Sequence, residues 1–164
     1  MNKVNIIGHR VESTHQVNAN ISHRAVILKY DTGAKCTVIS VGMFDDSLTE
    51  TDLQKFTAFC EEHCPDKYKE NFISATGDLF KGYLVTAHNV KMGNTTLQEF
   101  RYYLVVENKR DIALVGFDFI DKCNRYADAY GDIHITEFDE DGYGSLDGSM
   151  ENDEVIAFID SLSA

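Results

Sequence analysis

The feature that most constrains the fold is a sharp break between two apolar runs, in the stretch ILKYDTGAKCTVIS at residues 27–40. A β-branched run leads into Asp31-Thr32-Gly33-Ala34, and a second apolar run follows at Val38-Ile39. Aspartate and glycine favour turns, because aspartate bonds to nearby backbone groups and glycine accepts unusual backbone angles. The stretch therefore predicts two strands joined by a tight loop, and an ordinary turn would explain the loop taken alone.

Strand-forming patterns recur along most of the chain. Turns are expected at Thr76-Gly77-Asp78 and Met92-Gly93-Asn94. Residues 111–124 predict a buried strand that continues with helical spacing through Cys123. The other predicted strands, with a polar connector between the first two, are residues 3–8, 24–30, 36–43, 71–75, 79–87, 99–107 and 129–138.

Two helices are expected beside the strands. Residues 49–64 predict an amphipathic helix, because apolar residues recur at helical spacing and Pro65 ends the run. Residues 139–154 are acidic and rich in Gly and Ser, so we expect a solvated linker. An apolar stripe after it predicts a short helix over 155–164, docked on its own domain or on a partner. The expected organisation is one domain over 1–138 with a helical insertion at about 45–70, then linker and helix.

The net charge indicates which partners are disfavoured, and the N-terminal sequence indicates the compartment. The formal net charge of -12 disfavours nucleic acid and membrane surfaces, because both are anionic. The first apolar run is shorter than the roughly 7–15 residues of an export signal. We therefore expect a cytoplasmic protein with reduced thiols. The initial Met favours a free-standing protein, and release from a larger precursor is the open alternative.

Two further motifs follow the Asp-Thr-Gly-Ala loop along the chain. NFISATGDLFKGYLV, at residues 71–85, has Gly77 at its predicted turn. IALVGFDFI, at residues 112–120, joins aliphatic residues, a glycine, one further residue and an aspartate to a helix start. In this order the three motifs resemble the active-site loop, flap hairpin and glycine-helix motif of the retropepsin-like (retroviral-type) aspartic proteases. The resemblance covers residues 24–138 and implies a mainly β acid-protease barrel with an inserted helix and a C-terminal helix.

The resemblance also implies a role for each matching residue. Asp31 would be the catalytic acid and base that activates a water for peptide hydrolysis. Asp118 would form hydrogen bonds at the start of its helix. The supporting residues would be Thr32 bracing the loop against a second subunit, Gly33 admitting the substrate backbone, Ala34 lining the groove, Thr76 and Gly77 at the mobile flap tip, and Val115 and Gly116 beside the cleaved bond.

The number of catalytic acids predicts the assembly. The sequence contains one Asp-Thr-Gly triplet and no Asp-Ser-Gly triplet. Because this chemistry uses two carboxylates that share a proton, catalysis would need a homodimer in which Asp31 of each subunit meets at a two-fold axis. The expected function is an aspartic endopeptidase that acts on extended polypeptides and uses no metal or other cofactor.

Three departures from the family pattern leave alternatives open. They are the insertion at about 45–70, the single flap glycine, and Phe117 where relatives often have arginine. The leading alternative is a catalytically weak dimerisation or peptide-binding module of the same fold. The second is a metal-dependent regulatory protein built on Cys60, His63 and Cys64, although these residues do not complete a closed zinc site.

Overall fold

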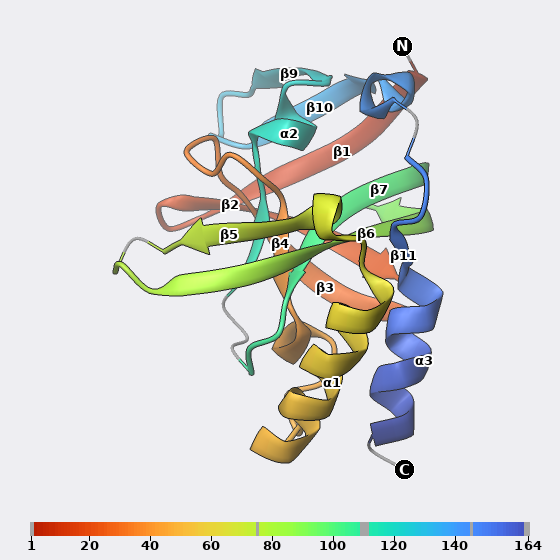
Figure 1. Ribbon diagram of the computed structural model, residues 1–164. Coiled ribbons are helices and arrows are strands. Elements are labelled where there is room, and N and C mark those ends of the chain that lie inside the picture. The colour runs from red at the N-terminus through yellow and green to blue at the C-terminus, as the bar shows by residue number, and fades with distance from the viewer. Residues whose placement is uncertain (1, 75, 109–111, 145, 163–164) are drawn as a thin grey trace.

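The computed structural model describes residues 2–74, 76–108, 112–144 and 146–162, and its strands form one highly curved sheet (Figure 1). The described helices are α1 (Glu50–His63), α2 (Phe117–Ile120) and α3 (Asn152–Leu162), with short 3-10 turns η1 (Val41–Met43), η2 (Asp66–Tyr68) and η3 (Glu140–Tyr143). The strands are β1 (Asn2–Val11), β2 (Thr14–Ile21), β3 (Arg24–Tyr30), β4 (Val38–Ser40), β5 (Lys69–Ile73), β6 (Leu79–Met92), β7 (Thr95–Val105), β8 (Ala113–Val115), β9 (Cys123–Ala127), β10 (Ile133–Phe138) and β11 (Met150–Glu151).

The centre of the sheet closes on itself. Strands follow the order β6-β7-β4-β8-β3-β2, and β2 pairs again with β6 through Ala19 and Asn20 opposite Met92 and Lys91. Closure leaves these strands with few free edges and encloses an apolar interior. The largest fully buried side chains include Phe100, Tyr102 and Leu28 from this ring.

Two extensions leave the closed ring. On one side β1 pairs with both β2 and β10, and β10 pairs with β9, which forms the end of the sheet. On the other side β5 and β11 pair with different parts of the same long strand, β6. The β5–β6 hairpin therefore projects from the barrel, as Figure 1 shows on its left side.

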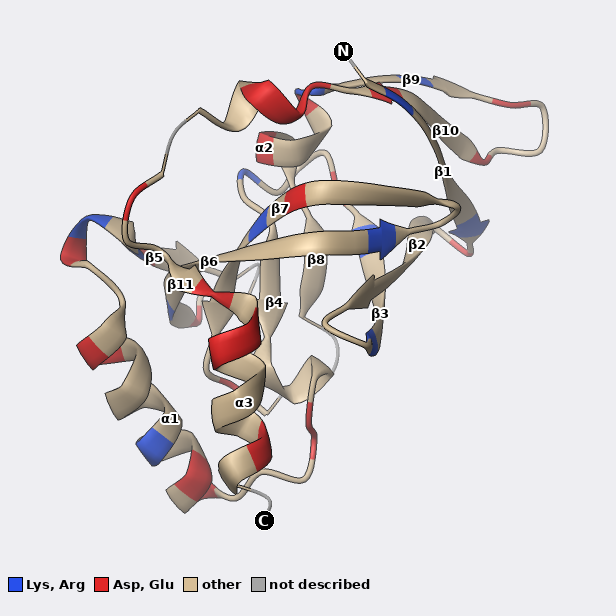
Figure 2. Ribbon diagram, turned by 90° about the vertical axis from the view of Figure 1, so that its right-hand side faces the viewer, with Lys and Arg blue, Asp and Glu red and all other residues tan. Residues whose placement is uncertain are grey.

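The two longer helices lie side by side against the barrel (Figure 2). The α1 helix begins with a reciprocal capping box, in which Thr49 and Asp52 satisfy each other's backbone N–H groups. Its buried Phe56 faces the core, while the Phe59 ring stacks on Phe158 of α3 at a centroid distance of 4.3 Å. The C-terminal helix therefore docks on its own chain, which was one of the two predicted alternatives.

The structure corrects several sequence predictions in the N-terminal half and the hairpins. The polar connector is wrong: residues 14–21 form β2, whose buried Val17, Ala19 and Ile21 alternate with polar residues. The predicted strand at 36–43 shrinks to β4 and continues as η1. β6 continues to Met92, past the predicted end at 87, whereas β7 begins at Thr95, before the predicted 99, and ends at Val105, before the predicted 107. Residues 75 and 111, at the ends of two predicted strands, lie outside the described residues, as do residues 163 and 164.

The C-terminal part also differs from the prediction. Helical structure ends at Ile120, and Cys123 instead begins β9. Residues 139–154 are not simply a solvated linker, because they include η3, β11 and the start of α3. Arg101 of β7 donates hydrogen bonds to the backbone oxygens of Tyr143 and Gly144, and Met150 is buried. The acidic composition of this segment predicted a linker, because composition does not reveal the few contacts that bind the segment to the barrel.

Among the described residues, no helix has the length and apolar character needed to cross a bilayer.

Replacing a buried residue of α3 tests how strongly this helix is bound. Ile159 is fully buried, so Ile159→Ala should lower the free energy of unfolding by about 2–4 kcal/mol through lost burial and a residual cavity. Urea denaturation measures the change. Glu154→Ala, on the exposed side of the same helix, should change stability by less than about 0.5 kcal/mol. Equal effects of the two variants would show that α3 is not docked through Ile159.

Candidate active site

The Asp31 loop connects β3 to β4, and these two strands are not neighbours in the sheet. β8 is inserted between β3 and β4: it runs parallel to β3 and antiparallel to β4. The backbone N–H of Asp31 donates to the Val115 oxygen at 3.0 Å, which continues the β3–β8 pairing into the loop. Within the loop, the Gly33 N–H donates to Asp31 Oδ1 at 2.9 Å and the Ala34 N–H donates to the Asp31 oxygen at 3.2 Å. The carboxylate is therefore held at a defined position where the strands diverge.

The start of α2 packs directly on the other limb of the loop. The Phe117 N–H donates to the Ala34 oxygen at 2.8 Å, and the Asp118 N–H donates to the Lys35 oxygen at 3.1 Å. This approach depends on Gly116, because a Cβ there would lie 2.4 Å from both the carbonyl carbon and the oxygen of Cys36. A separation of that size is not possible, so the glycine is required by packing against backbone.

The buried Thr37 and the half-buried Asp118 form a polar link between loop and helix. The Asp118 carboxylate accepts hydrogen bonds from the Thr37 N–H at 3.0 Å and from the Thr37 hydroxyl at 2.7 Å. It also accepts from the Phe119 N–H at 2.8 Å, as expected for an acid at a helix start. The Thr37 hydroxyl in turn accepts from the Gly116 N–H at 3.1 Å. Sequence analysis missed Thr37, although a hydroxyl residue beside the Asp-Thr-Gly-Ala loop was available as a signal.

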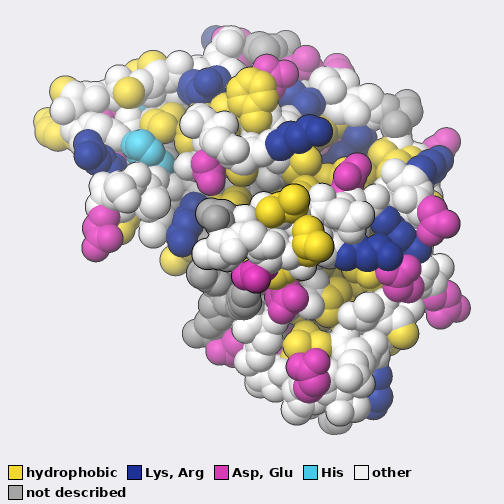
Figure 3. Space-filling view, turned by 60° about the vertical axis from the view of Figure 1, so that its left-hand side comes forward, with side chains coloured by type: hydrophobic (Ala, Val, Ile, Leu, Met, Phe, Trp, Pro, Cys, Tyr) yellow, Lys and Arg dark blue, Asp and Glu magenta, His cyan; other side chains and the backbone are white. Residues whose placement is uncertain are grey.

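A cavity of about 710 Å³ lies over the loop. Asp31, Gly33 and Ala34 form part of its floor, and the β5–β6 hairpin lies across from them. On the face where the hairpin comes forward, acidic and basic side chains are interspersed with hydrophobic ones (Figure 3). The remaining lining residues are Lys35, Cys36, Val38, Glu70, Asn71, Phe72, Ile73, Ser74, Phe80, Tyr103, Val105, Ile112 and Leu114.

The predicted supporting residues fall into three places. Thr32 is exposed beside the cavity floor. Thr76 and Gly77 form the turn of the β5–β6 hairpin, where Gly77 has a φ of 87° and the Thr76 hydroxyl donates to Asp78 at 3.0 Å. Val115 and Gly116 are buried behind the loop and support it, while their neighbour Leu114 lines the cavity.

Aromatic residues that sequence analysis did not single out shape the cavity. Phe72 and Phe80 are opposite each other in the hairpin, and the Phe72 ring contacts Tyr103 edge-on at a centroid distance of 5.2 Å. Burial raises the pKa of Tyr103 to about 12, with Cys36 and Glu70 adding to the effect. Tyr103 therefore stays a neutral residue of the cavity wall at ordinary pH. The placing of Phe72 and Phe80 on either side of the predicted turn was the available signal.

Comparison with known proteins identifies the fold. The structure is similar to that of a retropepsin-like aspartic protease from Rickettsia conorii, with a TM-score of 0.52, 20% identity, and coverage of 82% of this chain and 92% of that chain. The chain has a retropepsin-like fold. A protease of EIAV, solved with an inhibitor, is also similar, with a TM-score of 0.40, 14% identity, and coverage of 66% and 86%. No model of a known protein family matches the sequence, and no curated protein matches it.

The cysteines have structural surroundings in this retropepsin-like fold. Cys60 and Cys64 are buried, and burial raises the pKa of both thiols, which opposes formation of the metal-binding thiolate. The His63 ring packs on Phe59 at a centroid distance of 4.4 Å. Within the described ranges, no group of three or more His, Cys, Asp or Glu residues is placed to hold a metal ion.

The contact at Gly116 gives a test of how the retropepsin-like fold holds its loop. Gly116→Ala should lower the free energy of unfolding by about 1–3 kcal/mol or more, because its methyl group would overlap the Cys36 backbone. Gly8→Ala is the control, since its methyl group would lie 3.5 Å or more from its neighbours. Thermal and urea unfolding measure both variants. A Gly116→Ala protein as stable as Gly8→Ala would contradict the packing argument.

Proposed function

We propose that the protein is an aspartic endopeptidase that hydrolyses peptide bonds as a homodimer. The observation that carries this proposal is the Asp31 carboxylate, fixed by the Gly33 N–H on the floor of a cavity of about 710 Å³. The fold is that of a known aspartic protease, and the loop in question is Asp-Thr-Gly-Ala. Proteins that share a fold can differ in activity, so the presence of Asp31 supports the proposed activity more strongly than the fold does.

The homodimer follows from the chemistry. One chain supplies one Asp-Thr-Gly loop, whereas the reaction needs a second carboxylate within hydrogen-bonding range. A two-fold axis beside Asp31 would bring the equivalent residue of a second copy to that place. Thr32 is exposed on the same loop and would meet the second copy there.

The paired carboxylates would divide the work between them. Two carboxyl groups about 3 Å apart cannot both be ionised at ordinary pH. Between the two pKa values of the pair, the two groups therefore share one proton. The ionised carboxylate would take a proton from water as the water oxygen attacks the peptide carbonyl carbon. The protonated carboxyl would donate to the carbonyl oxygen. Proton transfer to the amide nitrogen then accompanies C–N cleavage and releases an amine and a carboxylic acid.

The remaining residues would bind an extended polypeptide. Gly33 would let the substrate backbone approach the floor, and Ala34 would contact its side chains. Thr76 and Gly77 would close over it from the hairpin turn and exclude water. Val115 and Gly116 would act from behind the loop, next to the pocket wall formed by Leu114. All four cysteines are free thiols, which supports a cytoplasmic location for the enzyme.

Removing the acid tests the proposed activity. Asp31→Asn should lower peptide cleavage by about 10²–10⁴-fold, because an amide cannot accept the proton of water. The assay is cleavage of a diverse peptide mixture, read by mass spectrometry, with the oligomeric state of both proteins recorded.

Two results would contradict the proposal. The first is equal cleavage by wild type and a folded Asp31→Asn dimer. The second is a folded wild-type dimer that cleaves nothing but binds peptides, which would favour the binding module.

Acidity should increase the proposed activity. The chain carries a formal charge of -12 at pH 7, so two protomers repel each other less as pH falls and carboxylates gain protons. We expect kcat/KM to peak at about pH 5–6. Measurements from about pH 4 to 8, with sedimentation at each pH, test this. A rate that increases monotonically to pH 8 would rule it out.

A further inference from the structure

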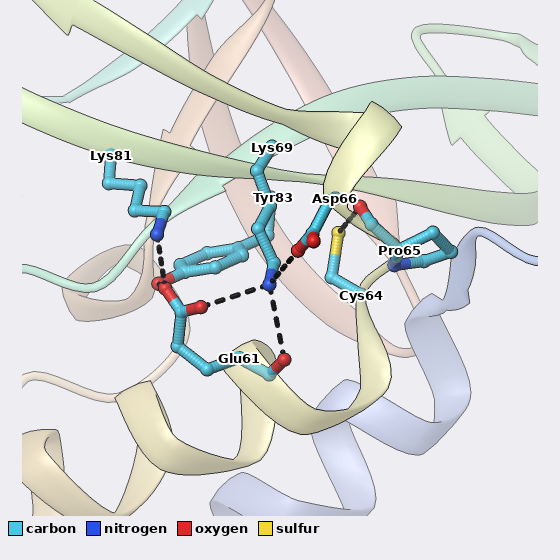
Figure 4. Close-up of polar contacts among 7 residues, drawn as sticks. All are labelled: Glu61, Cys64, Pro65, Asp66, Lys69, Lys81 and Tyr83. Atoms are coloured by element: carbon cyan, nitrogen blue, oxygen red, sulfur yellow. Dashed lines mark hydrogen bonds and ion pairs between the residues drawn. The ribbon is translucent and has the colours of Figure 1, made fainter.

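The Glu61 carboxylate, on the last turn of α1, is a shared hydrogen-bond acceptor for both strands of the β5–β6 hairpin (Figure 4). Lys69 of β5 donates to Oε2 at 2.9 Å. From β6, Lys81 lies 2.5 Å from Oε1 and the Tyr83 hydroxyl donates to the same oxygen at 2.7 Å. One side chain of the inserted helix therefore contacts both strands at the base of the hairpin.

Lys69 makes this contact more than a surface ion pair. Its ammonium group donates to the Glu61 carboxylate, to the Glu61 backbone oxygen at 3.2 Å, and to Asp66 at 2.8 Å. All three ammonium hydrogens thus have acceptors, and one of them satisfies a carbonyl at the end of α1. The Lys69 side chain is only 12% exposed, so solvent screens these contacts less than it screens a typical surface pair.

The strand register relates the Glu61 contacts to the cavity. Lys69 is opposite Tyr83, and two residues further along Asn71 is opposite Lys81. Side chains alternate across a strand, so the intervening pair, Glu70 and Gly82, and the pair after Asn71, Phe72 and Phe80, extend from the other face. Phe72 and Phe80 line the cavity. Glu61 therefore holds one face of the hairpin, and the opposite face is the roof above Asp31.

The far end of the hairpin has little other support. Ile73 and Leu79 form the last cross-strand pair before the turn and are 74% and 75% exposed. Nearer the base, the Phe72 ring contacts Tyr103, and Gly82 leaves room for that ring. Among the described residues, the Phe72–Tyr103 contact on the cavity side and the polar cluster on the α1 side thus help to fix the position of the hairpin.

The polar cluster persists in acid. Hydrogen bonds from Lys81, Tyr83 and Lys69 lower the pKa of Glu61 to about 2. An unfolded glutamate has a pKa of about 4.3. The stabilisation is therefore complete above that value and is lost only as pH falls through the folded pKa. Glu61 remains charged at the acidic pH where we expect activity.

We propose that Glu61 is a positioning residue that anchors the β5–β6 hairpin to α1 and so sets the height of the cavity roof above Asp31. The inference deepens the proposed peptidase function and rests on it for the kinetic consequence. It gives the helical insertion, a departure from the family pattern, a role in substrate binding. The anchoring itself is a property of the folded protein and can be measured without any substrate.

Glu61→Gln in the full chain tests the anchoring. The amide keeps the size of the carboxylate but loses its charge, so Lys81 loses its ion pair with residue 61 and Lys69 keeps only its ion pair with Asp66. We expect amide hydrogen exchange in residues 70–74 and 76–82 to become about tenfold faster. Exchange in the barrel strands β3 and β8 should stay unchanged. The matched control is Glu62→Gln, because Glu62 is exposed and adjacent, and its side chain forms no hydrogen bond or ion pair with any described residue.

Kinetics separate positioning from general destabilisation. With a cleaved peptide, Glu61→Gln should raise KM by roughly 3- to 10-fold and change kcat by less than about twofold. A purely structural role would lower the active fraction, which reduces kcat and leaves KM unchanged. Glu62→Gln should match wild type in both constants.

The two proposals fail in different ways. If wild type cleaves no peptide, the peptidase function is lost, yet faster hairpin exchange in Glu61→Gln would still establish the anchor. Unchanged hairpin exchange, or the same increase in Glu62→Gln, would overturn the anchor. If Glu61→Gln does not fold, Lys81→Gln decides the question, because it removes one contact from a half-exposed side chain and should accelerate hairpin exchange in the same direction.

Discussion

The contact between Gly116 and the backbone of Cys36 is the constraint on which the site depends. It allows α2 to lie directly on the Asp31 loop, where Phe117 and Asp118 bond to the loop carbonyls. The Thr37–Asp118 cluster then satisfies the polar groups that this close approach buries. A buried polar network of this kind fixes geometry because each group is costly to leave unpaired. The position of the Asp31 carboxylate is thus set by backbone packing.

Barrel closure provides the rigid frame for that contact. The β2–β6 pairing closes a ring that contains β3 and β4, which flank the Asp31 loop, and β6, which carries one limb of the hairpin. Floor and roof of the cavity therefore belong to the same closed sheet. The C-terminal segment strengthens this frame, since β11 pairs with β6 and α3 packs on α1. The acidic segment and the helix are parts of the scaffold that supports the roof.

The inserted helix connects the scaffold to the cavity. Phe56 and Phe59 attach α1 to the core and to α3, and Glu61 at its end attaches the hairpin. In the proposed peptidase, a roof that opens for substrate would benefit from an anchor at its base. Ile73 and Leu79, near the other end of the hairpin, are exposed. Together these contacts explain how a departure from the family pattern can serve the same site.

Much of the local structure follows from the sequence. Helical periodicity and caps predicted α1 within one residue at each end, and turn chemistry placed the Asp31 loop and the hairpin turn. β2 was missed because polar residues outnumber apolar ones in it, although Val17, Ala19 and Ile21 alternate as a half-buried strand requires. The prediction of a solvated linker over residues 139–154 was wrong because a few buried contacts hold this acidic segment against the barrel.

What the sequence by itself determined is the set of short-range features: the strands, the capped helix, and an acid, a hydroxyl and a glycine at one break. Those features depend on neighbours a few residues apart. The tertiary structure alone decided that β8 lies between β3 and β4, that Thr37 bonds to Asp118, and that Glu61 contacts Lys69, Lys81 and Tyr83. These pairings join residues far apart in the chain, and their partners are selected by barrel closure and packing, which no local pattern encodes.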